Sequence, residues 1–279
     1  MRSLLPCALM CVLPIVALAG PVRDHRVVAE LVPVVDAIVP GETFTVCLNI
    51  KHDPKWHTYW KNPGLAGVPT KLIWDLPDGF EAGPIQWARP QRVKMAIYNT
   101  FGYEDEVTLL VDIQAPASAA IGDEIELKAK TTWMMCAETC HPSSAKLSLT
   151  MPVAASSSPN TRGSRLAAET RATMPVENDR WETSAKLEKD SATLVLTQKA
   201  GVELPAKNEQ LYFFSDDGLI DSHPEQTVAQ TAPGIYKLSL PRAEFGPKNP
   251  TALTGVLLSK FGEASIAYSI RAEFAPEEK

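Results

Sequence analysis

Apolar and polar side chains alternate with a period of two along much of the chain, in short segments that end at turn residues. The clearest example is residues 44–50, where every second side chain is apolar and Cys47 lies on the opposite face of the predicted strand. Such alternation indicates a strand with one buried face and one exposed face. Other strands are predicted before residue 152, at 26–32, 71–74, 106–113, 124–133 and 146–151. Short strands spaced in this way, about seven in all, predict a β-sandwich of the immunoglobulin-like type.

A polar, serine-rich segment at residues 154–165 interrupts the alternation and is typical of a linker. A short helix is predicted after it at 165–174, because Pro175 would end it. The alternation then resumes, with strands predicted at 193–197, 210–214, 236–240 and 266–272. The sequence therefore predicts an all-β fold of two β-sandwich domains, with boundaries at 20–152 for the first domain, 153–180 for the linker and 181–279 for the second domain.

The start of the chain has the composition of an export signal. Arg2 supplies a positive charge, residues 4–18 are almost wholly apolar, and Ala17-Leu18-Ala19 offers a small-x-small cleavage site. We therefore expect residues 1–19 to be a signal peptide that is too short to span a membrane. The mature protein is expected to be soluble and periplasmic, without direct insertion into the membrane. A net charge of −6 without a basic stripe argues against binding to nucleic acid.

Five cysteines occur in the chain, and Cys7 and Cys11 would leave with the signal peptide. Cys47 is expected to be a buried side chain of its strand. Cys136 and Cys140 can form a disulfide only if the chain turns between them, because an extended strand would hold their Cα atoms about 13 Å apart. Closing so short a loop removes only about 2 kcal/mol of unfolded-state entropy. The pair therefore suits reversible redox chemistry or soft-metal binding better than stabilisation.

Three roles are open for this pair on the residues alone. The first is thiol–disulfide exchange, which needs an accessible thiolate and a second thiol that resolves the mixed disulfide. The second role is a static disulfide. The third is copper(I) binding, because this ion accepts thiolate, thioether and imidazole ligands. The expected copper set is Cys136, Cys140, His141 and Met135, whereas the neighbouring Met134 would point to the opposite face of its strand.

Charged and aromatic residues near the pair bear on its reactivity. Glu138 would raise the thiol pKa values, whereas His141, if protonated, would lower them, and the sequence leaves open which effect is larger. Cys140 is a candidate for the less nucleophilic thiol, but the sequence does not decide which thiol attacks. A second cluster consists of His57, Tyr59 and Trp60. This cluster either lies beside the cysteines and shapes access to them or packs its rings within a proline-rich turn.

Several motifs occur here in the order in which a known family has them. They are WHTYWKNPG at 56–64, GPIQW at 83–87, FGY at 101–103, the Trp133…Cys136-x-x-x-Cys140-x-Pro142 cluster and, more loosely, YFF at 212–214 and GLID at 218–221. On these motifs the chain resembles the periplasmic N-terminal region of the thiol:disulfide interchange protein DsbD. The resemblance is greatest to the ScsB-like, copper-sensitivity-suppressor branch. The cysteine spacing is shorter than in the best-known DsbD members.

The resemblance implies an immunoglobulin-like domain whose Cys136/Cys140 pair passes electrons to periplasmic proteins, either disulfide-bonded or thioredoxin-like. It further implies a role in copper tolerance or cytochrome c biogenesis, no cofactor, and protein-disulfide reductase activity if the chain is an enzyme. An aromatic cap over the pair is implied as well, with Phe101 and Tyr103 as candidates. Because the chain contains neither the transmembrane nor the thioredoxin-like domain of the family, we expect its electron donor to be a separate membrane-embedded thiol reductase.

Overall fold

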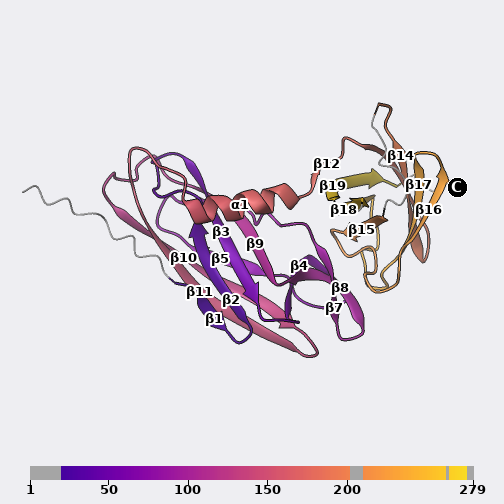
Figure 1. Ribbon diagram of the computed structural model, residues 1–279, viewed down its shortest axis with the longest axis horizontal. Coiled ribbons are helices and arrows are strands. Elements are labelled where there is room, and N and C mark those ends of the chain that lie inside the picture. Colours follow the sequence, from indigo (N-terminus) through magenta and orange to yellow (C-terminus); the bar gives the residue numbers. More distant parts are fainter. Residues whose placement is uncertain (1–19, 202–209, 262–263, 275–279) are drawn as a thin grey trace, which may run out of the picture.

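The computed structural model describes residues 20–201, 210–261 and 264–274 (Figure 1). Within these residues the fold consists of mainly antiparallel sheets and a single helix, which confirms the predicted all-β class. No helix in the described part of the chain is long and apolar enough to cross a membrane. The predicted signal peptide, residues 1–19, lies outside the described residues.

Two sheets form the first sandwich. One sheet has the order β1 (Val22–Asp24), β2 (Val27–Pro33), β3 (Thr43–His52), β9 (Glu106–Gln114) and β6 (Glu81–Ala82). The other has the order β11 (Cys140–Pro152), β10 (Glu124–Cys136), β4 (His57–Gly64), β8 (Tyr98–Glu104) and β7 (Gln91–Met95), with β5 (Lys71–Asp75) paired to β10. Most of the strands predicted from alternation are present, and β10 and β11 are both longer than predicted.

The hydrophobic core of the first sandwich decides which way the end of β10 faces. Trp60 of β4 and Leu48 of β3 lie in this core. The odd-numbered side chains of β10 also enter it, among them Trp133 and Met135. Because successive side chains of a strand point to opposite faces, Cys136 faces away from the core.

Helix α1 (Thr161–Thr173) covers the outer face of the sheet that contains β3 (Figure 1). Asn160 caps the helix by accepting a hydrogen bond from the backbone N–H of Gly163 at 3.0 Å. Leu166 of the helix packs in one cluster with Cys47 of β3. Strand β3 is therefore buried on both faces, and the prediction of one exposed face was wrong because the helix covers it.

The serine-rich linker is docked on the first sandwich. The carbonyl oxygen of Ser158 accepts a hydrogen bond from the backbone N–H of Asp36 at 2.9 Å, and the hydroxyl of Ser157 accepts one from Ala37 at 2.9 Å. The predicted short helix is confirmed, although it begins at Thr161 rather than at residue 165.

The second half of the chain forms two further sheets around their own core. Their orders are β12 (Val176–Glu177), β19 (Ala264–Glu273), β18 (Ala252–Phe261), β15 (Gln210–Ser215), and β13 (Trp181–Leu187), β14 (Ser191–Gln198), β17 (Ile235–Pro241), β16 (Thr227–Ala232). Alternation did not predict β16, whose side chains are almost all exposed, or β18, which is buried on both faces. In β19, Tyr268, Ile270 and Ala272 are buried as predicted, whereas Ile266 is 43% exposed.

The two halves are joined by an aromatic cluster. Phe214 and Val256, from the second half, belong to the hydrophobic core of the first sandwich. The ring of Phe214 lies 4.9 Å from that of Phe101 and 6.3 Å from that of Trp60, in edge-to-face contacts. These contacts fix the second half against strands β4 and β8 (Figure 1).

Replacement of Gly163 by alanine should destabilise the protein, although alanine is the better helix former by about 1 kcal/mol. A Cβ atom at this position would collide with the Pro33 carbonyl group of β2. We expect the free energy of unfolding in urea to fall by about 1–3 kcal/mol, as for overpacking. Ala168→Gly on the exposed face of the helix is the matched control, with a cost of about 1 kcal/mol. A Gly163→Ala protein as stable as the wild type would contradict this close contact.

Candidate functional site

A disulfide joins the last residue of β10 to the first residue of β11. Cys136 and Cys140 are paired directly across the two strands, with their Cα atoms 4.2 Å apart. The backbone N–H of Ala137 donates to the carbonyl of Thr139 at 3.1 Å and closes the turn between them. The predicted turn between two strands is therefore confirmed.

The two sulfur-bearing residues differ in exposure. Cys136 is fully buried, at 0% exposure, whereas Cys140 is exposed. Cys136 also pairs with His57 of β4, so the disulfide and the imidazole share the outer face of the sheet. The pair is thus accessible from one side only, at Cys140.

His57 and Tyr59 lie beside the disulfide. The Tyr59 hydroxyl is 4.0 Å from the sulfur of Cys140 and 3.3 Å from Nε2 of His57. Both side chains come from strand β4 rather than from a turn, and strand alternation sends Trp60 into the core instead. Of the two interpretations of the aromatic cluster, the first therefore holds for His57 and Tyr59, and Trp60 packs in the core.

Burial keeps these two side chains neutral. It raises the pKa of the Tyr59 hydroxyl to about 12, and it lowers the pKa of His57 to about 4, with a smaller contribution from the nearby His52. Tyr59 therefore retains its proton and can donate a hydrogen bond toward Cys140. Because Nδ1 of His57 is buried without a partner, the tautomer protonated at Nε2 fits best, and this tautomer donates to the Tyr59 oxygen.

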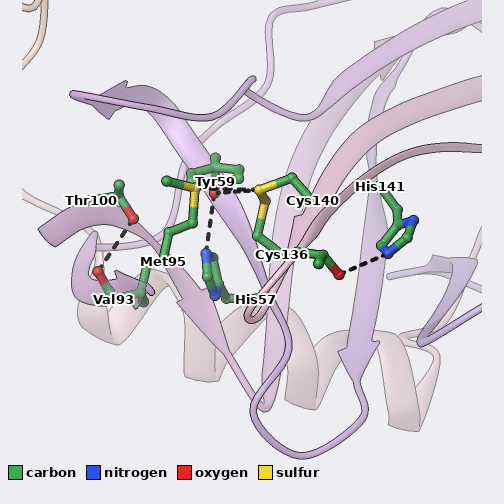
Figure 2. Close-up of a disulfide and its surroundings, with 9 residues drawn as sticks. His57, Tyr59, Val93, Met95, Thr100, Cys136, Cys140 and His141 are labelled. Carbon is green, nitrogen blue, oxygen red and sulfur yellow. Dashed lines mark hydrogen bonds between the residues drawn. A yellow bond between two sulfur atoms is a disulfide. The ribbon is translucent and has the colours of Figure 1, made fainter. Parts of the chain in front are cut away.

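Met95 lies against the exposed sulfur. It ends strand β7, and its Sδ atom is 3.3 Å from Sγ of Cys140 (Figure 2). Figure 2 shows the thioether and the Tyr59 hydroxyl beside Cys140, where together they form a cap over the disulfide. The β7–β8 hairpin was not predicted, and the alternation of its five-residue β7 strand is too short to reveal it.

The predicted aromatic cap residues lie elsewhere, which is a correction. Phe101 packs against Phe214 in the core that the two halves share. Tyr103 is buried and donates its hydroxyl hydrogen bond to the carbonyl of Ala88 at 2.7 Å. Both point from β8 into the protein core, so the cap is formed by Met95 instead.

The side chains predicted as copper ligands are not brought together. Met135 lies in the hydrophobic core. His141 is on the opposite face of β11 from Cys140, where its ring lies 5.7 Å from that of Trp56 and its Nε2 is 3.0 Å from the hydroxyl of Thr139. Figure 2 shows His141 directed away from the disulfide. Among the described residues, no group of three or more His, Cys, Asp or Glu side chains could hold a metal ion.

A groove of about 470 Å³ lies beside the cysteine turn. It runs between this turn and the tip of the β7–β8 hairpin. Glu138, which is exposed in the turn, lines it together with Trp56, Lys55 and Lys94. A partner that reaches Cys140 would therefore meet an open surface with both charged and aromatic side chains.

An immunoglobulin-like sandwich with a one-sided disulfide at the end of a hairpin defines a class of domain suited to thiol–disulfide exchange. Residues 28–152 match the model of one such family, thiol:disulfide interchange protein DsbD, N-terminal. This match confirms, for the first sandwich, the family resemblance predicted from the sequence motifs. No curated protein matches the chain.

One solved structure shows the same fold over nearly the whole chain. The protein is similar to the crystal structure of the N-terminal periplasmic domain of ScsB from Proteus mirabilis, with a TM-score of 0.67 and 15% sequence identity. The match covers 92% of this chain and 98% of the ScsB chain. A protein of unknown function from Porphyromonas gingivalis W83 has a TM-score of 0.26 at 10% identity, covering 88% of this chain and 99% of its own.

The buried imidazoles predict a loss of stability in mild acid. Burial lowers the pKa of both His52 and His57 from 6.5 to about 4. As the pH falls below 6.5, the unfolded chain takes up protons that the folded protein does not, so the stability present above pH 6.5 is lost toward pH 4. Each histidine should contribute about 2–3 kcal/mol to this loss.

Urea denaturation of the wild type and of a His57→Asn variant at pH 7 and pH 4.5 tests this contribution. The free energy of unfolding should fall more steeply with acid in the wild type, because the carboxylates titrate in both proteins and only His57 differs. Equal losses in the two proteins would contradict the assignment of a neutral, buried His57.

Proposed function

We propose that the protein carries out thiol–disulfide interchange in the periplasm and relays electrons through Cys136 and Cys140. The electron donor is a separate membrane-embedded thiol reductase, and the acceptors are disulfide-bonded or thioredoxin-like proteins. The observation that carries this proposal is the difference in exposure between the two cysteines. It gives each sulfur a separate role in exchange.

Cys140 is the sulfur that meets the partner. A thiolate of the donor attacks Sγ of Cys140, the bond between the two cysteines breaks, and Cys136 leaves as a thiolate that takes up a proton. The second donor thiol then attacks the donor sulfur of the mixed disulfide and releases Cys140. Two electrons have passed to the pair, and the donor is left as a disulfide.

The second half of the cycle reverses the roles. The Cys140 thiolate attacks a disulfide of the acceptor and forms a new mixed disulfide. Cys136, whose Cα atom is 4.2 Å away, attacks Sγ of Cys140 and releases the reduced acceptor. Because Cys136 is buried, it can act only on the sulfur next to it, which suits the resolving role.

Tyr59 supports the attacking form of Cys140. Its hydroxyl stays protonated and lies 4.0 Å from the sulfur, so a small movement gives a hydrogen bond to a thiolate. A hydrogen bond to the charged form lowers a thiol pKa. The Nε2–H group of His57 donates a hydrogen bond to the Tyr59 oxygen at 3.3 Å and so orients the hydroxyl. Copper(I) binding is not proposed, since Met135 and His141 point away from the pair.

Trapping of a mixed disulfide tests the two roles. In a Cys47→Ala background, Cys136→Ala and Cys140→Ala proteins are mixed with a thioredoxin-like protein whose active-site cysteine carries thionitrobenzoate as a leaving group. The Cys136→Ala protein should form the covalent complex at least about tenfold faster than the Cys140→Ala protein, because only Cys140 is accessible. Equal rates, or faster reaction through Cys136, would contradict the assignment.

Tyr59→Phe should raise the pKa of the Cys140 thiol in the Cys47→Ala, Cys136→Ala protein. Loss of a hydrogen bond to a thiolate corresponds to about one pKa unit or more. The pH dependence of alkylation by iodoacetamide measures this pKa. Tyr103→Phe, which removes a buried hydroxyl that bonds to Ala88, is the matched control and should leave the pKa of Cys140 unchanged. An unchanged pKa in Tyr59→Phe would exclude the tyrosine from the exchange step.

A further inference from the structure

The β7–β8 hairpin that carries Met95 is weakly held by its own sheet. Among the strands that the structure describes, β7 is at the edge of its sheet and pairs only with β8. The ladder between β8 and β4 is interrupted between Tyr59 and Gly64, on the side that leads to the hairpin tip. The position of the thioether over the disulfide therefore depends on contacts from outside the sheet.

Those contacts come from the second half of the chain, and Ser222 is at their centre. Ser222 lies in the segment that connects β15 to β16, and it is fully buried. Its hydroxyl donates to the carbonyl of Asn99 in β8 at 2.8 Å and accepts from the backbone N–H of Leu65 at 2.8 Å. Asn99 is the cross-strand partner of Lys94, which immediately precedes Met95. One hydroxyl thus joins the hairpin to the segment that follows β4.

The segment that begins at Leu65 forms the other wall of the site. Gly67, with φ of 110°, lies so close to the Tyr59 ring that a Cβ atom there would collide with it. Gly64 in turn leaves no room for a side chain beside Ser222. Ser222 therefore binds both the backbone that packs on Tyr59 and the hairpin that carries Met95.

Neighbouring residues of the second half hold the same hairpin. The side-chain amide of Asn99 donates to the carbonyl of His223 at 3.0 Å. Arg92 of β7 forms an ion pair with Glu225 at 2.6 Å, and its guanidinium lies 4.8 Å from the centre of the Tyr212 ring. These contacts, together with the Ser222 hydrogen bond to Asn99, come from the second half and end on the β7–β8 hairpin.

We infer that the second domain controls access to Cys140, with Ser222 as the positioning residue that holds the Met95 hairpin over the disulfide. This inference rests on the proposed exchange function. The thioether lies 3.3 Å from Sγ of Cys140 and restricts the approach of a partner to this exposed residue, and the hydrogen bonds of Ser222 oppose its movement away. The second domain, residues 181–279, contains no cysteine. It nevertheless sets the rate of exchange through its contacts with the hairpin.

The rate of disulfide reduction by excess dithiothreitol tests the inference in the full mature chain with Cys47→Ala. Ser222→Ala should accelerate reduction about tenfold, because it removes two hydrogen bonds. Met95→Ala should accelerate it by a similar factor, and the double variant should be no faster than Met95→Ala alone. Asn99→Ala keeps the hydrogen bond from Ser222, which ends on the backbone carbonyl, and loses the one from the Asn99 side chain to His223. It should give a smaller acceleration, and it serves as the second variant if Ser222→Ala unfolds.

Asp216→Asn is the matched control. It weakens the ion pair between Asp216 Oδ1 and Lys61 Nζ (2.6 Å), which joins the two halves but does not involve the hairpin. The rate of disulfide reduction should therefore stay unchanged. The inference is overturned if Ser222→Ala and Asn99→Ala both reduce at the wild-type rate, or if the effects of Ser222→Ala and Met95→Ala multiply. These rates report access to the sulfur with a small reductant. Failure of the exchange function itself would appear separately, in the trapping of a mixed disulfide through Cys140.

Discussion

The alternation of side chains at the end of β10 determines how this site is built. Trp133 and Met135 fill the core of the sandwich, so Cys136 must face the other way, out of the core and opposite His57. The disulfide consequently lies on the outer face of a sheet, where only neighbouring structure can cover it. Cys136 is fully buried there, whereas Cys140 is exposed and has Tyr59 and Met95 beside its sulfur. A one-residue change of register would place the cysteines in the core and remove their access to partners.

The second half of the chain takes part in this arrangement although it supplies no group to the disulfide. Its aromatic rings extend the core of the first sandwich. Its Ser222 side chain binds the β7–β8 hairpin, which the rest of the sheet holds only weakly. A rigid sandwich positions the cysteines, and a neighbouring domain holds the movable cap. Access and reactivity can therefore be adjusted at residues remote from the sulfur atoms.

Much of this could be predicted from the sequence, because strand alternation and turn residues are local properties. The cysteine turn, most strands of the first sandwich and the family resemblance were predicted on such grounds. The cap was not, because Met95 meets Cys140 through strand pairing, which no local pattern records. For the same reason Phe101 and Tyr103 were placed over the disulfide, whereas their strand points them into the core. The exposed face expected for β3 was wrong because α1 covers it.

The reduction potential of the Cys136–Cys140 couple tests the exchange role most directly. It is measured in mature protein with Cys47→Ala. Burial raises the pKa of the Cys47 thiol to about 12, so this thiol is unreactive in the folded protein. The substitution therefore removes only side reactions of Cys47 in the unfolded chain. A value between about −180 and −270 mV, the range of known exchange proteins, is expected. A value below about −300 mV is typical of structural disulfides and would contradict an electron relay through this pair.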